Sequence, residues 1–170
     1  LHNTLMLGCL KCIGGFYMEL DQERVGTDLR LFRIWLKASK MLFHNVIEDM
    51  KSYGLTSENF MVLELLYHKG PHYIQTISEK LMIPSGSITY VVNRLAEKNL
   101  VKKEQDKTNR RYWKVSITDK GEKLFHEIFP KHVHVIRDHF KSLTDDEKET
   151  LANLLKTVGF TAERLKEQKV

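Results

Sequence analysis

Cysteine is scarce in this chain of 170 residues, which contains only Cys9 and Cys12. The two residues form one C-x-x-C pair, and no second pair is present to complete a zinc site. No cysteine follows residue 12, so a sensor that works by thiol oxidation in the folded part of the chain is also excluded. The cysteine content therefore excludes a zinc ribbon and a thiol-based redox switch.

Long apolar segments are also absent. No run of hydrophobic residues approaches the roughly 20 that cross a bilayer as a helix. The charged start and small-residue cleavage site of a secretory signal peptide are missing as well. With 42% hydrophobic and 29% charged residues, the composition is that of a globular protein with one ordinary core. We expect a cytoplasmic protein without a membrane partner.

The residue patterns of catalysis and metal binding are not found either. No nucleophile–base pair or phosphate-binding loop is recognisable, so we expect a protein that is not an enzyme and needs no cofactor. Histidine occurs eight times, with His126, His132 and His134 in one predicted helix. Ligands on one helical face need a spacing of three or four residues, whereas these histidines are six and two residues apart. We therefore expect no metal site.

The beginning of the chain differs from the rest. Residues 1–26 show no clear periodicity, and a Gly-Gly pair that a ribosome-binding sequence can encode lies shortly before Met18. We therefore expect Met18 to be the native start and residues 1–17 to be translated leader, the alternative being a genuine N-terminal arm. In both cases we expect no stable fold in residues 1–26. Mass spectrometry of protein expressed from the native gene distinguishes the two.

Helical periodicity begins at Thr27 and continues to about Lys51, with apolar residues on two stripes. A surface helix needs one apolar stripe against its own core, so the second stripe indicates burial against a partner subunit. Gly54 ends this segment.

Local capping chemistry marks the later helices. We expect further helices over residues 56–69, 74–81, 85–98 and 118–140, and a last one from residue 144. The expected N-caps are Thr56, Ser85, Thr118 and Thr144, the last in a capping box with Glu147. Asn99 is expected in the left-handed conformation after its helix. Pro130 predicts a kink or an interruption near Ile128.

The rest of the chain is organised around residues 83–117. A helix with a polar, cationic outer face is followed by a hairpin with a basic tip, and residues 112–117 alternate as in a strand. Such a helix fits the major groove of DNA, and the hairpin can reach the neighbouring backbone or minor groove. The sequence therefore predicts a mainly α fold with a small β wing, a winged helix-turn-helix. Residues 55–117 form the DNA-binding module, and residues 27–54 and 118–170 form a helical dimerisation region.

Charge supports this assignment. The net charge is +5 and the pI is about 9.1. The excess of cations falls in and around the predicted hairpin, at Lys98, Lys102, Lys103, Lys107, Arg110, Arg111 and Lys114. A concentrated basic patch of this kind is typical of nucleic-acid binding.

Four ordered motifs resemble the MarR family of bacterial transcriptional regulators, over about residues 27–168. The motifs are LTSENFMVLELL (55–66), SGSITYVVNRLAEKNLV (85–101), DKTNRR (106–111) and ITDKG (117–121). They are similar to the family's LT-x-x-x-F-x-V-L, its recognition helix with L-x-x-K-G-L-V, its wing signature D-P-x-D-R-R and its L-T-x-x-G. Asn99 stands where the family usually has Gly, Lys107 replaces the usual Pro, and Asn109 replaces the second Asp. The two departures in the wing make its tip more positive.

The resemblance implies a homodimer whose first helix and last two helices interlock, so that two winged modules bind a pseudo-palindromic operator. It also implies a repressor that is released by a small aromatic or phenolic effector, held between the DNA-binding module and the dimer helices. The candidate lining residues are Trp35, His44, Phe60 and Met61. The alternative for these side chains is an ordinary core position.

Candidate DNA contacts lie in the hairpin and the helix before it. Arg110 is assigned to a minor groove, with a simple exposed ion pair to Asp106 as the alternative, and Lys107 and Arg111 are assigned to phosphates. Asn93 can pair bidentately with adenine and Arg94 with guanine. The complete set of candidates is Gln75, Thr76, Ser85, Ser87, Thr89, Tyr90, Asn93, Arg94, Lys107, Asn109, Arg110 and Arg111.

Two alternatives stay open. Each residue of the helix face is a DNA contact or a solvated side chain, since recognition helices place only three or four side chains on bases. The module of residues 55–117 either binds DNA or is a winged helix that binds an acidic protein. A specific footprint on DNA separates these two functions.

Overall fold

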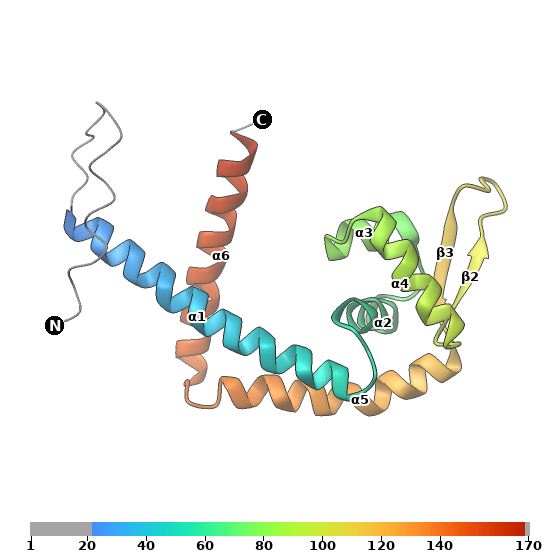
Figure 1. Cartoon of the computed structure of the whole chain (residues 1–170), viewed down its shortest axis with the longest axis horizontal. Helices are drawn as coiled ribbons and strands as arrows, with labels where there is room; N and C mark the ends of the chain where they lie inside the picture. Colours follow the sequence, from blue (N-terminus) through green and yellow to red (C-terminus); the bar gives the residue numbers. More distant parts are fainter. Residues whose placement is uncertain (1–21, 169–170) are drawn as a thin grey trace. The chain divides into compact units, whose positions relative to one another are not determined.

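A computed structural model describes residues 22–168 of the chain, and side chains from residue 25 onwards. Figure 1 shows the elements, which are α1 (Gln22–Ser52), α2 (Ser57–Lys69), β1 (His72–Tyr73), α3 (Ile74–Leu81), α4 (Ser85–Glu97), β2 (Val101–Gln105), β3 (Trp113–Ile117), α5 (Asp119–His139) and α6 (Asp145–Glu167). The predicted mainly α fold with a small β wing is confirmed. The chain divides into two units, Leu1–Met41 and Leu42–Val170.

Helix α1 begins before the position expected from the sequence. It starts at Gln22, so the expectation of no stable fold in residues 1–26 is wrong for the last five of them. Gln, Glu and Arg have high helix propensity, and they extend the helix without any apolar periodicity to mark it. In the first unit both apolar stripes are exposed, with Leu31 61% and Phe32 59% accessible. The leader hypothesis for residues 1–17 concerns residues outside the described range.

The second unit begins with the last turns of α1, and α2 follows after a short turn. Gly54 ends the turn in a left-handed conformation, with φ of 69°. Thr56 is the N-cap of α2, as expected, and its hydroxyl oxygen accepts a hydrogen bond from the Asn59 backbone N–H at 3.2 Å. Gly70 ends α2 with φ of 73°.

Helix α3 spans the residues expected for it, and it ends in a tight turn. Met82 adopts the left-handed conformation with φ of 52°, and the Ser78 hydroxyl donates to the Ile83 carbonyl oxygen at 2.6 Å. The expectation that Ser85 is the N-cap of α4 is wrong. Pro84 holds that position without a side-chain cap, and its carbonyl oxygen accepts from the Ile88 N–H at 3.0 Å. Proline loses nothing at a helix start, because its missing N–H would have no partner there.

The three strands form an antiparallel sheet in the order β1-β3-β2. In β2, Lys103 lies opposite Val115 and Gln105 opposite Trp113 of β3. Asn99 precedes β2 in the expected left-handed conformation, with φ of 58°. Strand β1 was not predicted, because two residues carry no detectable alternation. In Figure 1 the β2–β3 hairpin stands beside α4 with its base at the start of α5.

The core of the second unit lies where α2, α4 and α5 meet the sheet. Its fully buried side chains include Phe60, Leu63, Leu66, Ile77, Ile88, Leu95, Val115 and Phe125. At the base of the hairpin, the Thr118 hydroxyl caps α5 by accepting from the Gly121 N–H at 3.1 Å and donates to the Asn99 carbonyl oxygen at 2.7 Å. A Cβ on Gly121 would lie 2.1 Å from the Leu100 carbonyl oxygen. The hairpin base can therefore approach α5 only because residue 121 is glycine.

The last two helices have different environments. A kink or an interruption was expected near Ile128; helix α5 continues through Pro130, so the interruption does not occur. Buried Phe125 and Ile128 before the proline and His132 after it hold the helix against the core. Helix α6 begins with the expected capping box of Thr144, and none of its described side chains is buried.

Candidate nucleic-acid interface

The outward face of α4 is available to a partner. Ile88, Val91, Val92 and Leu95 face the core, which turns the polar residues of the helix outward. Tyr90 is 65% exposed, and the Arg94 guanidinium carbon lies 6.0 Å from the centre of its ring. Arg94 also lies 3.6 Å from the Glu97 carboxylate, a distance that gives a weak surface pair. Ser85, Ser87 and Thr89 are exposed on the same helix.

Asn93 is held by the hairpin. It is half-buried, and its side-chain oxygen Oδ1 accepts a hydrogen bond from Lys103 Nζ at 2.6 Å. The Lys103 ammonium also lies 5.5 Å from the centre of the Trp113 ring, within the range of a cation–π contact. From the sequence, Lys103 is expected only as part of the basic patch, because nothing in the sequence shows which helical residue a strand residue meets.

The turn at the hairpin tip is organised by the carboxylate of Asp106. It accepts hydrogen bonds from the Thr108 N–H at 2.8 Å, the Asn109 N–H at 2.9 Å, the Tyr73 hydroxyl at 2.6 Å and the Thr108 hydroxyl. The hydroxyl of Thr108, then that of Tyr73 and the two backbone N–H groups, hold the pKa of Asp106 well below its usual range. Each of these bonds favours the ionised carboxylate.

The cations of the tip are exposed while its backbone is hydrogen-bonded. Lys107, Arg110 and Arg111 are all exposed. The Arg110 carbonyl oxygen accepts from Gln105 Nε2 at 2.7 Å, and the Arg111 N–H donates to Asn109 Oδ1 at 3.1 Å. Asn109 therefore shapes the tip through its side chain.

The alternative partner considered for Arg110 is engaged elsewhere. Among the ion pairs of residues 25–168 none joins Asp106 to Arg110. The carboxylate of Asp106 binds the backbone of its own turn and Tyr73 instead. The guanidinium of Arg110 is thus presented to solvent.

Strand β1 supports the tip from the side. Tyr73 packs its ring at 5.9 Å from that of Tyr112 and donates its hydroxyl to Asp106. Tyr73 is not among the residues expected from the sequence, where its only signal is its position as an aromatic residue just before a predicted helix. Gln75 and Thr76 lie in the first turn of α3, with Gln75 exposed and Thr76 half-buried.

The four candidate pocket residues lie in different surroundings. Phe60 is fully buried, with its ring centre 5.2 Å from that of Phe125 and 4.4 Å from that of His132. Met61 is half-buried and His44 is exposed. Trp35, 44% exposed, belongs to the first unit.

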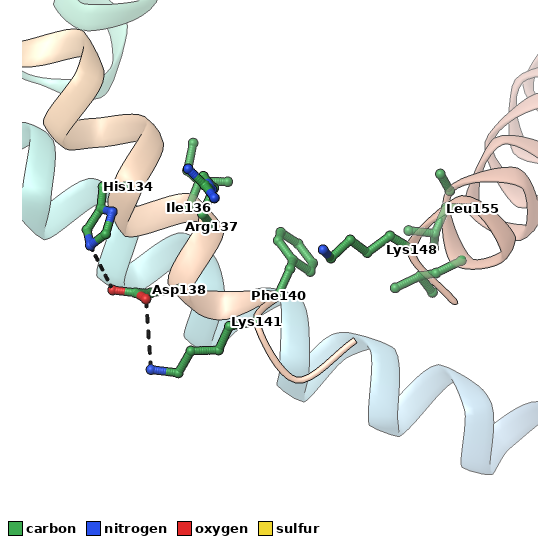
Figure 2. Close-up of a pocket in the computed structure, with 10 residues that line it drawn as sticks. His134, Ile136, Arg137, Asp138, Phe140, Lys141, Lys148 and Leu155 are labelled. Carbon is green, nitrogen blue, oxygen red and sulfur yellow. Dashed lines mark ion pairs between the residues drawn. The ribbon is translucent and has the colours of Figure 1, made fainter. Parts of the chain in front are cut away.

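A cavity of about 530 Å³ lies at the junction of α5 and α6, and it is lined by none of those four residues. Its apolar lining includes Phe140 and Leu155. Figure 2 shows Asp138 between His134 and Lys141, with which it forms ion pairs of 3.7 and 3.8 Å. A second hollow, of about 680 Å³, lies beside Tyr90 and Arg94 and extends to the start of α2.

Three histidines of α5 take part in polar contacts within the protein. His132 Nδ1 lies 2.6 Å from Asp49 Oδ2, His126 Nδ1 lies 3.0 Å from the Tyr67 hydroxyl, and His139 Nε2 lies 3.1 Å from Asn45 Nδ2. Within residues 25–168, no three His, Cys, Asp or Glu side chains are grouped as metal ligands. None of the described helices is both long and apolar enough to span a membrane.

Comparison with known proteins agrees with this geometry. A model of the MarR family matches residues 55–112, the stretch from the start of α2 to the hairpin tip. The HTH-type transcriptional regulator MhqR of Bacillus subtilis is 38% identical over 136 residues, which are 80% of this chain and 94% of that protein. The uncharacterized HTH-type transcriptional regulator YkoM of the same organism is 34% identical over 148 residues, 87% of this chain and 96% of that protein.

Solved structures share the fold. AbsC of Streptomyces coelicolor, a MarR family regulator, superposes with a TM-score of 0.73 at 24% identity, over 82% of this chain and 95% of that one. A cysteine-to-serine mutant of Escherichia coli MarR complexed with operator DNA gives 0.68 at 22% identity, over 78% and 95%. NadR in complex with 4-hydroxyphenylacetate gives 0.60 at 21% identity, over 73% and 88%.

These relatives are named as regulators of transcription. Two of them exceed 30% identity and align over nearly their whole length, and the matched stretch of the family model, residues 55–112, includes α4 and β2. The chain belongs to the MarR family of DNA-binding transcriptional regulators.

Proposed function

We propose that this protein is a cytoplasmic, ligand-released repressor that binds a pseudo-palindromic operator as a homodimer. The observation that carries the proposal is the exposed face of α4 beside a hairpin tip with a hydrogen-bonded backbone and exposed cations. A helix and a basic hairpin in this arrangement fit adjacent grooves of one duplex.

In the proposed complex α4 enters the major groove. Tyr90 and Arg94 then face base edges, and the planar guanidinium of Arg94 pairs with guanine. Ser85, Ser87 and Thr89, together with Gln75 and Thr76 of α3, are close enough to the groove walls to contact bases or phosphates.

The hairpin tip contacts the neighbouring backbone and minor groove. Arg110 enters the minor groove, where negative potential attracts a guanidinium. Lys107 and Arg111 neutralise phosphates, which adds affinity and salt dependence without base preference. Asn109 acts by holding the tip in shape, since its side chain is bound to the Arg111 backbone.

A second copy of the chain is the proposed cover for α6 and for the apolar stripes of α1. Three apolar side chains of α6 are exposed to solvent, namely Leu154 (60%), Val158 (59%) and Phe160 (63%). Apolar surface on this scale is characteristic of an interface. A twofold dimer places two modules about one DNA turn apart and matches a pseudo-palindrome.

The proposed effector is a small phenol or aromatic acid. The support is the structure of NadR with 4-hydroxyphenylacetate, a protein of the same fold. Of the candidate lining residues in the second unit, His44 is exposed and Met61 is half-buried, so both offer surface to a ligand. Phe60 is fully buried in the core and offers none. Trp35, in the first unit, is also exposed.

The test is a footprint of the purified protein on the DNA upstream of its own gene, repeated with a panel of phenols and aromatic acids that includes 4-hydroxyphenylacetate. We expect a protected dyad that one class of compound abolishes. Absence of any protected sequence would contradict DNA recognition and favour the alternative of a winged helix that binds an acidic protein. Protection of the DNA that none of the compounds changes would contradict release by an aromatic effector.

A further inference from the structure

Lys103 and Asn93 form a polar pair between the hairpin and the outward face of α4. Lys103 Nζ donates to Asn93 Oδ1 at 2.6 Å. On its other side the ammonium lies 5.5 Å from the centre of the Trp113 ring. Lys103 and Trp113 are diagonal neighbours across β2 and β3, because Trp113 lies opposite Gln105, two residues along the strand. The ammonium is therefore positioned by the sheet before any DNA arrives.

This contact determines which end of the Asn93 amide faces the partner. An ammonium can only donate hydrogen bonds, so the amide oxygen must be the atom that faces Lys103. The amide nitrogen, with its two N–H donors, is then the end left for a ligand of α4. Without Lys103 the amide is free to rotate, and it can present its oxygen and nitrogen side by side.

The difference matters for base recognition. Bidentate pairing of Asn with adenine requires the oxygen to accept from adenine N6 while the nitrogen donates to N7. With a lysine ammonium already at that oxygen, an approaching amino group meets a second donor and a positive charge. Guanine presents two acceptors, O6 and N7, on the same groove edge. The N–H donors of Asn93 and the nearby ammonium complement that edge.

We propose that Lys103 is a positioning residue that makes Asn93 a hydrogen-bond donor, so that this site on α4 selects guanine over adenine. The inference rests on the proposed DNA-binding function. It replaces the adenine contact expected for Asn93 from the sequence alone. Lys103 acts here through Asn93 and has no requirement to touch the base itself.

The test is selection from randomised double-stranded DNA followed by affinity measurements on the selected duplexes. For the wild-type protein we expect guanine at one position of each half-site, preferred over adenine by about tenfold. Lys103→Met keeps a long apolar stem on Trp113 but removes the ammonium, and should shift that position toward adenine. Asn93→Ala should abolish the preference at the same position, and Lys103→Arg should retain it.

Lys102→Met is the matched control. Lys102 is the preceding residue on β2, its side chain is 60% exposed, and its ammonium lies 3.1 Å from the Glu104 carboxylate. Its loss should lower affinity for all duplexes alike and leave every base preference unchanged. Folding of each variant is checked by its thermal melting curve.

The outcomes separate this inference from the proposed function. If the wild-type protein enriches no sequence, the proposed function fails and this inference fails with it. If it enriches a dyad but Lys103→Met weakens binding to all duplexes equally and shifts no preference, Lys103 has a structural role only. In that case the inference is overturned while sequence-specific binding stands.

Discussion

The substitution Gly121→Ala tests how the base of the hairpin is built. A methyl group at this position would lie 2.1 Å from the Leu100 carbonyl oxygen and 2.9 Å from Ile117 Cγ1, whereas ordinary contacts begin near 3.4 Å. The carbonyl cannot rotate away as a flexible side chain would, because it accepts the Thr118 N–H at 3.1 Å. The start of α5 or of β2 must therefore move by about 1 Å or more.

Overpacking of this kind costs about 3 kcal/mol, at the upper end of the usual range. For a chain of this length the loss corresponds to a decrease in melting temperature on the order of 10 °C. The assay is urea unfolding followed by circular dichroism, at fixed protein concentration because the proposed dimerisation would add to stability.

Gly86→Ala is the matched control for this substitution. Gly86 lies in α4, and a methyl group there meets no atom within 4 Å. Without DNA its stability should be unchanged or raised by up to about 1 kcal/mol, as expected for Ala in place of Gly in a helix. If Gly121→Ala unfolds at the same urea concentration as the wild-type protein, the close approach of α5 to the hairpin base is refuted.

Four further predictions concern the proposed DNA-binding surface and the proposed dimer. Arg110→Ala should weaken operator binding by about 1 kcal/mol or more in an anisotropy titration, and unchanged affinity at moderate salt would refute its groove contact. In a carbon-13 carboxyl titration, Asp106 should stay ionised at pH values below the ordinary aspartate pKa of about 3.9. The hairpin tip should therefore keep its shape at a pH of about 3.9 and lose it only as the pH falls through the lowered pKa of Asp106. Tyr73→Phe removes one of the bonds to the carboxylate and should raise that pKa toward the ordinary value; no change would contradict the hydroxyl contact. Leu154→Glu should convert the dimer to monomer in sedimentation equilibrium, and a dimer that persists would exclude this face of α6 from the interface.

The parts of the fold that local chemistry determines were predictable from the sequence. Thr56 and Thr144 were recognised as N-caps because the cap and its bonded residue lie three positions apart in one segment. Asn99 was recognised because few residue types tolerate a left-handed turn. Ser85 was expected to be the N-cap of α4 because serine has a strong intrinsic preference for N-cap positions. The left-handed turn before Pro84 instead moves the helix start by one residue, so that Pro84 is the N-cap.

The parts of the site that depend on contacts between distant segments were not predictable. Asp106 and Tyr73 are 33 residues apart in sequence, and the bond between them requires the unpredicted strand β1. The partner of Asn93 depends on which residue of β2 lies beside α4. The pattern of charges in the sequence does not indicate which residue this is. The requirement for glycine at position 121 likewise arises from a backbone carbonyl 21 residues earlier.

The central claim is that α4 and the hairpin tip form the DNA-binding surface. Hydrogen–deuterium exchange of the protein with its operator duplex, compared with a scrambled duplex of the same length, tests it most directly. We expect the operator to slow exchange in peptides covering residues 85–97 and 105–113 more than the scrambled duplex does. Slowed exchange confined to α6 or α1, or an equal effect of both duplexes on every peptide, would contradict it.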